Sequence, residues 1–439
     1  MCLLHNERNC IKPTPMSEKN TGVTKVVIIG GGFAGLECAR NLANKDGFEV
    51  TLLDRTNHHL FQPLLYQVAT ATLAAPDIAR SLRGILEKSK NVTVFMDDIC
   101  GIDIDAKKVS GTSGQEYRYD TLVVAAGAKT GYFGNNHWEQ HTIGLKSLSD
   151  AYSVRKKVLE NLEAAERTDD PAERKRLMTI VIVGGGPTGV ELSGAFVELI
   201  KRSMRRNFRR LDVHSLKVIL VEAGPRILPP YIESNSAYAQ KRLEKIGVDV
   251  RTSTMVTDIQ PHTVITKDEE IKCGAILWAA GIEAEGITAH LPCERNRAGK
   301  VTPEADLSLT GHPNIFVAGD LVFMKDIADK PVPGVAPAAS QMGRHIAKLL
   351  LKEKKTGNSS DRQGFKYLDK GSMAIIGRSQ AVVEFGKMKL TGFIAWLAWL
   401  FIHIMFLVDF RSKVGVLLQW SWAYISDAPG ARVFVNKRK

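Results

Sequence analysis

The feature that most constrains this sequence is a glycine-rich turn set between a strand pattern and a helix pattern, because it occurs twice. In the first copy, the apolar run Lys25–Ile29 leads into Gly30–Gly35 and then into a helical pattern. Gly30 permits the tight turn, Gly32 lets the backbone approach a pyrophosphate, and Gly35 lets the helix pack close to the strand. The N–H groups at the helix start are then available to bind phosphate. This order predicts a dinucleotide site in a parallel α/β domain.

An acidic residue follows the first turn at the distance that such a site needs. Asp54 ends the next strand pattern and stands 19 residues after Gly35 (54 − 35). There its carboxylate is placed to accept hydrogen bonds from a ribose 2′-hydroxyl. A glycine turn that holds no ligand is the alternative, and the strand, helix and carboxylate around the turn favour the dinucleotide site over it.

The second copy begins 154 residues after the first (184 − 30) and predicts a second dinucleotide. Thr179–Val183 leads into Gly184–Gly189 and a helix, and the strand pattern Lys217–Glu222 follows. Glu222 stands 33 residues after the last glycine (222 − 189), which we attribute to an intervening helix that extends through Phe208.

The residues around the second acid bear on the choice of nucleotide. Glu222 would repel a 2′-phosphate, and Ala223 beside it offers no cation, so the sequence favours NADH over NADPH. Arg226, three residues further on, weakens this preference because a guanidinium can pair with a 2′-phosphate.

Length, charge and cysteine content limit the remaining possibilities. A chain of 439 residues, 44% of them hydrophobic, exceeds what one core usually holds, so we expect two or three domains. The net charge of +12 suits nucleic acid, an anionic membrane or acidic cofactors without choosing among them. Six scattered cysteines without a CxxC pair argue against zinc, iron–sulfur and disulfide sites, and we predict no metal. Residues 1–24 are polar and predict a loose tail rather than a signal peptide; a start at Met16 would keep the first strand complete.

Three more turns follow apolar strand patterns and fit the same architecture, namely Leu122–Gly127, Ile276–Gly281 and Asn314–Asp320. With the two glycine turns they resemble the two-dinucleotide-binding-domain flavoproteins. The resemblance implies that the first turn holds non-covalent FAD, that the second holds NADH, and that the Gly-Asp pair contacts the ribityl and phosphate region of the flavin. It assigns FAD to Gly30, Gly32, Phe33, Ala34, Gly35, Asp54, Gly127, Gly319 and Asp320, and NADH to Gly184, Gly186, Thr188, Gly189, Glu222 and Gly281.

Within that superfamily, three further motifs resemble the type II NADH:quinone oxidoreductases. They are His58–Thr70, Gly185–Glu191 and Tyr367–Ala374, and a tryptophan-rich C-terminus follows them. The resemblance covers residues 25 to about 430 and implies a respiratory NADH dehydrogenase that passes hydride from NADH to FAD and two electrons on to a membrane quinone, without pumping protons. Disulfide reductases of this fold need a redox CxxxxC pair, which the sequence lacks.

Two other functions stay open at this point. One is a flavin reductase of the same fold that uses NAD(P)H and a soluble or protein acceptor. The other is a redox-silent, flavin-binding protein tethered to a membrane. Bleaching of the flavin by NADH and the response to quinone would separate them.

The resemblance also assigns residues to the quinone side of the flavin. Ala336, Gln341 and Lys370 would flank the ring, and Lys370 would neutralise the anionic reduced flavin or donate a proton. Pro337 stands where the family pattern has its first glutamine, so the preferred quinone stays undetermined. Glu191 is expected to position the nicotinamide or relay protons; the alternative is a first-turn carboxylate that the helix dipole stabilises.

The C-terminal part predicts contact with a membrane surface. The apolar run Phe393–Val408 has 16 residues, which as a helix reaches roughly 24 Å against a hydrocarbon core of roughly 30 Å, too short for a confident span. A second apolar stretch, Val414–Ile425, carries Trp420, Trp422 and Tyr424. Residues 386–439 hold 8 basic and 2 acidic residues, a charge of +6, which favours anionic lipid over nucleic acid.

Each of these features also has a purely structural explanation. The C-terminal stretch could form a buried hairpin or a homodimer interface, and a lone histidine, His403, on a face with Trp396 and Trp399 is more typical of packing than of catalysis. The basic run Lys201–Arg210 is more typical of a solvated helix face than of a lipid patch, and no nucleic-acid motif accompanies it.

We therefore expect an α/β protein of two Rossmann-like domains with a C-terminal amphipathic helical segment, peripheral on the cytoplasmic face of the cell membrane. The predicted parts are a tail over 1–24, an FAD domain in two pieces, 25–145 and 291–385, an inserted NADH domain over 146–290, and a membrane-contacting segment over 386–439.

Overall fold

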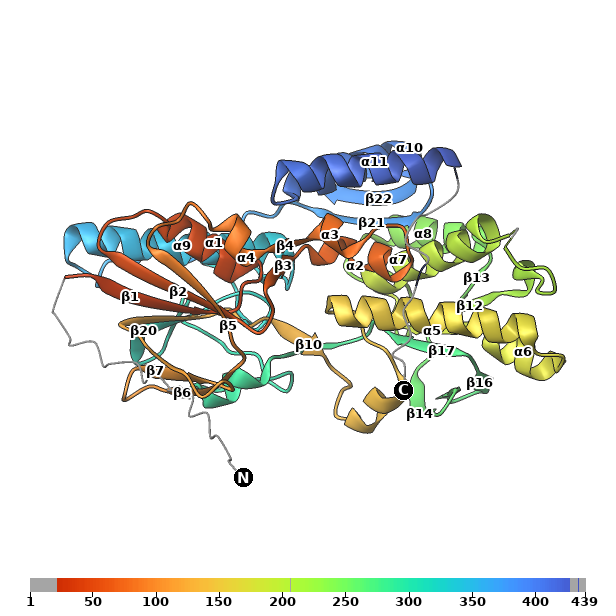
Figure 1. Ribbon diagram of the computed structural model, residues 1–439, viewed down its shortest axis with the longest axis horizontal. Helices are drawn as coiled ribbons and strands as arrows, with labels where there is room; N and C mark the ends of the chain where they lie inside the picture. The colour runs from red at the N-terminus through yellow and green to blue at the C-terminus, as the bar shows by residue number, and fades with distance from the viewer. Residues whose placement is uncertain (1–21, 206, 427–432, 434–439) are drawn as a thin grey trace, which may run out of the picture.

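The computed structural model describes residues 22–205, 207–426 and 433, and shows two α/β halves with a smaller layer across one of them (Figure 1). The predicted start at Met16, most of the predicted tail and the last basic residues lie outside the described residues.

The first half contains a six-stranded sheet in the order β19-β20-β9-β1-β2-β5. All neighbours in it are parallel except the β19–β20 pair. Its buried β-branched and leucine side chains form one core with the helices α1 and α9, which lie against each other. The bounds are β1 (Thr24–Ile29), β2 (Phe48–Asp54), β5 (Val92–Met96), β9 (Thr121–Val124), β19 (Ser308–Leu309), β20 (His312–Val317), α1 (Phe33–Leu42) and α9 (Ala336–Thr356).

The second half contains a parallel four-stranded sheet in the order β13-β12-β11-β17. Because these strands lie in sequence between β9 and β19, the first domain is discontinuous and the second is inserted in it, as predicted. An antiparallel pair, β10–β18, joins the two halves (Figure 1). The bounds are β11 (Thr179–Val183), β12 (Lys217–Val221), β13 (Val248–Arg251), β17 (Ala275–Trp278), β10 (Ala128–Thr130), β18 (Ile282–Ala284), α5 (Leu148–Arg167), α6 (Pro171–Leu177), α7 (Pro187–Val197) and α8 (Glu233–Ile246).

The smaller layer is an antiparallel sheet covered by two helices. The sheet packs on α7 and α8 of the second half, and α10 and α11 lie over it (Figure 1). Its bounds are β21 (Ser372–Gly377), β22 (Gln380–Phe385), β23 (Met388–Thr391), α10 (Gly392–Phe406) and α11 (Phe410–Ser426). Since the boundary predicted at residue 385 would divide this sheet, we propose that the last boundary lies before β21.

Short elements complete the chain. Two three-stranded antiparallel sheets flank the halves, and a small ribbon with three short helices connects β2 to β5. Their bounds are β6 (Ile99–Asp103), β7 (Lys108–Gly111), β8 (Glu116–Arg118), β14 (Val256–Gln260), β15 (Thr263–Thr266), β16 (Glu270–Lys272), β3 (His58–Leu60), β4 (Ala79–Ser81), α2 (Leu65–Ala69), α3 (Ala75–Ile78) and α4 (Leu82–Ile85).

One predicted helix is shorter than expected. The helix expected through Phe208 ends with α7 at Val197 and one π-helical turn, Glu198–Ser203. Beyond Ser203, the described residues of the basic run Lys201–Arg210 form turns and bends rather than a helix face. Within this run, the backbone N–H groups of Arg209 and Arg210 donate hydrogen bonds to the Glu166 carboxylate at 2.8 and 3.0 Å.

Candidate active site

The two glycine turns have the same geometry. Gly30 and Gly184 have φ of +101° and +110°, which L side chains rarely adopt. A Cβ at Gly35 would lie 1.9 Å from the carbonyl oxygen of Gly30, and a Cβ at Gly189 would lie 1.9 Å from that of Gly184. Both helices therefore sit as close to their strands as a glycine allows.

The open side of each turn faces the helix start. No described atom lies within 4 Å of a Cβ built at Gly32 or Gly186, the residues that precede α1 and α7. The first N–H groups of a helix lack partners within it and carry partial positive charge, so this space suits a pyrophosphate. Thr188 lies in the first turn of α7, and Phe33 and Ala34 lie in the first turn of α1.

Asp54 and Glu222 also accept hydrogen bonds from the glycine turns, which the sequence does not predict. The Gly31 N–H donates to Asp54 Oδ2 at 2.6 Å, and the Gly185 N–H donates to Glu222 Oε2 at 2.6 Å. Each carboxylate thus fastens its own glycine turn, while oxygen lone pairs remain for a ribose hydroxyl. Arg226 donates to the Pro229 carbonyl at 3.0 Å, an interaction that the sequence pattern does not reveal.

The other predicted nucleotide residues lie at the same strand ends. Gly127 follows β9 and Gly319 follows β20, with φ of +79° and +86°. Because β20, β9 and β1 are parallel neighbours, these glycines and Asp320 share one sheet edge with the first turn. Gly281, with φ of +73°, follows β17 beside the second turn.

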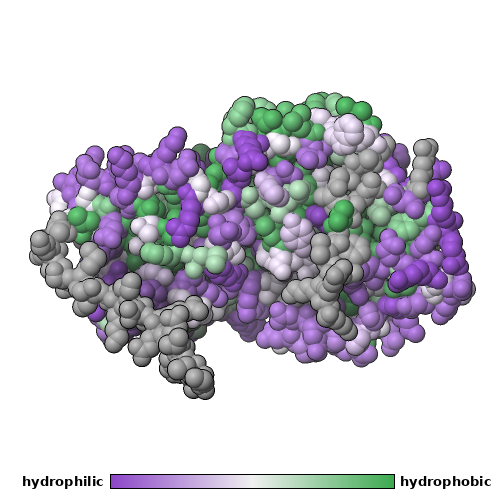
Figure 2. Space-filling model, viewed as in Figure 1, coloured by the Kyte–Doolittle hydropathy of each residue, from purple (hydrophilic) through white to green (hydrophobic). Residues whose placement is uncertain are grey.

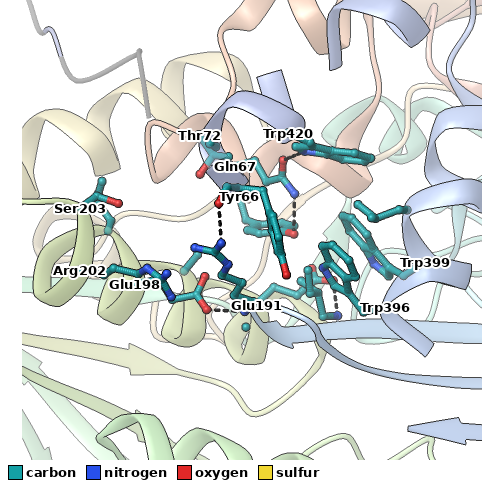
Figure 3. A pocket seen from close by; sticks show the side chains of 18 residues that line it. Tyr66, Gln67, Thr72, Glu191, Glu198, Arg202, Ser203, Trp396, Trp399 and Trp420 are labelled. Atoms are coloured by element: carbon teal, nitrogen blue, oxygen red, sulfur yellow. Dashed lines mark hydrogen bonds between the residues drawn. The ribbon is translucent and has the colours of Figure 1, made fainter. Parts of the chain in front are cut away.

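A cavity of about 150 Å³ lies between α2, α7 with its π turn, β21 and the two C-terminal helices (Figure 3). Its aromatic wall comes from Tyr66, Trp396, Trp399, Trp420 and Tyr424. A π turn at a cavity wall is typical of functional sites.

Charged groups form another part of the cavity wall, namely Glu191, Glu198, Arg202 and Arg378. Arg378 lies over the Tyr424 ring, 3.9 Å from its centre, and bonds to the Tyr424 carbonyl, and its own N–H donates to Glu198. The end of α11 is therefore fastened to this wall.

Glu191 is the predicted catalytic residue that lines this cavity. Burial raises the pKa of its carboxyl to about 8, and the Ile375 N–H, which donates to Oε1 at 3.4 Å, opposes the shift. A carboxylate stabilised mainly by the helix dipole would have a lowered pKa, so this geometry favours a protonated group near neutral pH.

A polar chain that the sequence does not reveal joins α11 to α2. The Trp420 indole N–H donates to Gln67 Oε1 at 2.6 Å, and Gln67 Nε2 donates to the Tyr66 hydroxyl at 2.8 Å (Figure 3). Arg155, buried on α5, donates to the Val68 carbonyl at 2.8 Å and so holds the end of α2. Tyr66 and Gln67 fall within a motif of the predicted family, but Trp420, which bonds to Gln67, lies 353 residues away in the sequence.

Gln341 and Lys370 lie outside the cavity lining. Gln341 on α9 exchanges two hydrogen bonds of 2.9 Å with the Leu368 main chain, one as donor and one as acceptor. The Lys370 ammonium lies 4.9 Å from the centre of the Phe406 ring at the end of α10. Ala336 begins α9, and Pro337 occupies its first turn, where a missing N–H costs nothing.

His403 is a packing residue, as its context in the sequence indicates. It stacks on Trp399 with ring centres 4.0 Å apart, and its Nδ1 contacts the Trp399 carbonyl at 2.8 Å. Burial lowers the pKa of this imidazole to about 4, so it is neutral at physiological pH.

Two of the described cysteines, Cys38 and Cys273, are buried packing residues. Burial raises the pKa of Cys38 and of Cys273 to about 12, and neither thiol is paired in a disulfide. Cys2 and Cys10 lie outside the described residues.

Known proteins with similar sequences or structures agree with an oxidoreductase that has two dinucleotide sites. A family model described as pyridine nucleotide-disulphide oxidoreductase matches residues 24–343. Type II NADH:quinone oxidoreductase Ndh of Mycobacterium tuberculosis is 40% identical over 426 residues, which cover 94% of this chain and 91% of that protein. NdhA of the same organism is 41% identical over 431 residues, 95% of this chain and 90% of that protein. The structure of NDH2 from Plasmodium falciparum in complex with NADH matches with a TM-score of 0.86 at 20% identity, covering 94% of this chain and 100% of that one.

The fold and the paired turns define a flavoprotein oxidoreductase with two dinucleotide sites. The chain belongs to the type II NADH:quinone oxidoreductases, within the pyridine nucleotide-disulphide oxidoreductase family. It is an FAD-dependent enzyme that oxidises NADH and reduces a quinone without pumping protons, which confirms the predicted fold class, function and cofactors. When bound, FAD supplies the two-electron chemistry that links a hydride donor to a quinone.

The chain itself supplies binding and orientation. Gly30–Gly35 with Asp54, and the Gly319–Asp320 turn, would hold FAD, since their geometry suits a pyrophosphate at a helix start. Gly184–Gly189 with Glu222 would hold NADH in the same way. Because both cradles lie at the carboxyl ends of parallel strands, the reacting ends of the two nucleotides can meet between the halves.

Proposed function

We propose that the quinone reaches the active site through the cavity beneath α10 and α11, and that Glu191 at its wall donates a proton to the reduced quinone. The observation that carries this proposal is the cavity itself, which joins a carboxyl of raised pKa to the tryptophans of the C-terminal helices. Aromatic walls suit a flat ring, and the raised pKa suits a proton donor near neutral pH.

We also place Ala336, Gln341 and Lys370 on the quinone side of the site, although they lie outside the cavity lining. Gln341 fastens the segment that leads to Lys370, and Lys370 in turn contacts the end of α10. In this proposal Lys370 supplies positive charge near the developing anion, while Gln341 sets where the lysine stands.

Gln341→Ala is expected to raise the KM for quinone about ten-fold, because it removes two hydrogen bonds that hold the Leu368 main chain. Steady-state kinetics with a soluble quinone measure this, and the KM for NADH should stay within about two-fold. The control is Gln240→Ala, whose side chain bonds only to Glu244 on the exposed face of α8. An unchanged KM and kcat for quinone in Gln341→Ala would remove Gln341 from the quinone side.

We further propose that the C-terminal helices bind an anionic lipid surface on the cytoplasmic face, where NADH is available. Every helix within 22–205, 207–426 and 433 is too short or too polar to cross a bilayer. A band of exposed apolar side chains covers the outer side of α10 and α11, the green cap of Figure 2. Its members include Phe393, Ile394, Leu397, Phe401, Phe410, Leu417, Leu418, Trp422 and Ile425. Four basic residues flank the apolar helices in the sequence, namely Lys387, Lys389, Arg411 and Lys413. Their positive charges can pair with the phosphates of anionic lipids.

The double variant Phe401→Glu, Leu418→Glu is expected to bind vesicles of phosphatidylcholine and phosphatidylglycerol at least about ten-fold more weakly. Each substitution removes the favourable free energy of burying an apolar side chain in the lipid and adds a charge whose burial is unfavourable. Both side chains are about two-thirds exposed, at 66% and 64%, so the fold should persist. Met255→Glu, on an equally exposed side chain of the second domain, is the control. Vesicle sedimentation measures the effect; binding that stayed at the wild-type level would exclude this surface as the lipid contact.

A further inference from the structure

His59 makes a buried contact with the first glycine turn. This histidine, 2% exposed on β3, places Nδ1 3.0 Å from the Gly31 carbonyl oxygen. A carbonyl can only accept, so Nδ1 carries the proton and donates it. The ring also meets the edge of Phe33, with ring centres 4.9 Å apart.

This bond orients the peptide that links Gly31 to Gly32. The peptide is trans, so its C=O and N–H point in opposite directions. With the Gly31 carbonyl held by His59 on the protein side, the Gly32 N–H is turned toward the open space before α1, where no described atom lies near the built Cβ. The preceding peptide is fixed as well, because the Gly31 N–H donates to Asp54 at 2.6 Å.

The second turn has the same arrangement with a different donor. There the Gly185 carbonyl accepts from the Leu228 backbone N–H at 2.7 Å, and the Gly185 N–H donates to Glu222. The Gly185 carbonyl is thus held by a main-chain donor, whereas the Gly31 carbonyl depends on the side chain of His59.

We propose that His59 is a positioning residue for FAD, which aims the Gly32 N–H at the pyrophosphate through its bond to the Gly31 carbonyl. Loss of that donor frees the peptide to rotate and leaves a buried carbonyl without its partner. FAD retention then falls while nucleotide binding at the second turn is unaffected. This role of His59 is independent of where the quinone binds.

The test compares His59→Leu with His59→Asn. The two replacements have similar shape, but only the asparagine amide can replace the Nδ1 donor. Wild-type and variant holoenzymes are diluted, and release of FAD is followed by the rise of free-flavin fluorescence. His59→Leu should release FAD about ten- to a hundred-fold faster than wild type, whereas His59→Asn should stay within about three-fold.

Two controls accompany the test. The Kd of NAD⁺, a non-reducing ligand of the second turn, should be unchanged in both variants. His58→Asn, one residue away, should release FAD as wild type does, because His58 Nδ1 contacts only the neighbouring Asn57 side chain.

Three outcomes would overturn the proposal. One is equal release from His59→Asn and His59→Leu, since that would mean ring packing and not the hydrogen bond retains FAD. Another is wild-type release from His59→Leu. If His59→Leu does not fold, ¹⁵N-histidine NMR of the wild-type holoenzyme decides: a proton on Nδ1 of His59 is the expected result, and an unprotonated Nδ1 is the third contradicting outcome.

Discussion

Gly35→Ala should yield a colourless protein, and Gly189→Ala should yield a yellow one that NADH no longer bleaches. In each case the new Cβ would lie 1.9 Å from a backbone carbonyl oxygen, so the helix start must move by more than side-chain adjustment can provide. A displacement of about 1 Å at a phosphate cradle is expected to lower NADH oxidation roughly a hundred-fold or more. The two variants separate the cradles because each changes only its own turn.

The measurements for this pair are FAD content per chain and anaerobic bleaching by NADH. Gly286→Ala is the control, since no described atom lies within 4 Å of its built Cβ and its φ is ordinary. The opposite pattern, a colourless Gly189→Ala and a yellow Gly35→Ala, would exchange the assignments of the two turns.

Glu191→Gln should lower kcat for quinone reduction about a hundred-fold, because glutamine cannot donate the proton that a buried carboxyl donates. In the wild type, Glu191 is protonated below about pH 8 and ionises above it. The wild-type kcat should therefore fall as pH rises through that value, and this fall should be absent from the variant's profile.

Kinetics from pH 6 to pH 9 with saturating NADH check this expectation. Glu233→Gln, an exposed carboxylate at the start of α8, is the matched control and should keep the wild-type profile. A Glu191→Gln variant with wild-type kcat and an unchanged profile would contradict the assigned role.

The two glycine turns and the strands and helices around them could be predicted from sequence because their determinants are local. Gly30, Gly35 and Asp54 act within one strand–turn–helix–strand unit, and the second unit repeats this order. The structure therefore confirms the fold class that these patterns indicate. The spacing to Glu222 predicts a helix through Phe208, which is longer than the helix observed, because the π turn after Val197 has no clear sequence pattern.

The rest of the site depends on contacts between distant segments. The hydrogen bond between Trp420 and Gln67 joins residues that are 353 positions apart in the sequence. The sheet β21–β23 belongs with the second domain because it packs on α7. The bond from His59 to Gly31 likewise depends on how β3 folds back on the first turn. Such pairs follow from tertiary packing, which no single local pattern contains.

The most direct test of two cradles serving one reaction is an anaerobic titration of the purified protein's visible spectrum. The protein should be yellow, NADH should remove the colour, and added quinone should restore it. A preparation that stayed colourless after incubation with FAD, or a yellow one whose spectrum NADH left unchanged, would contradict the account.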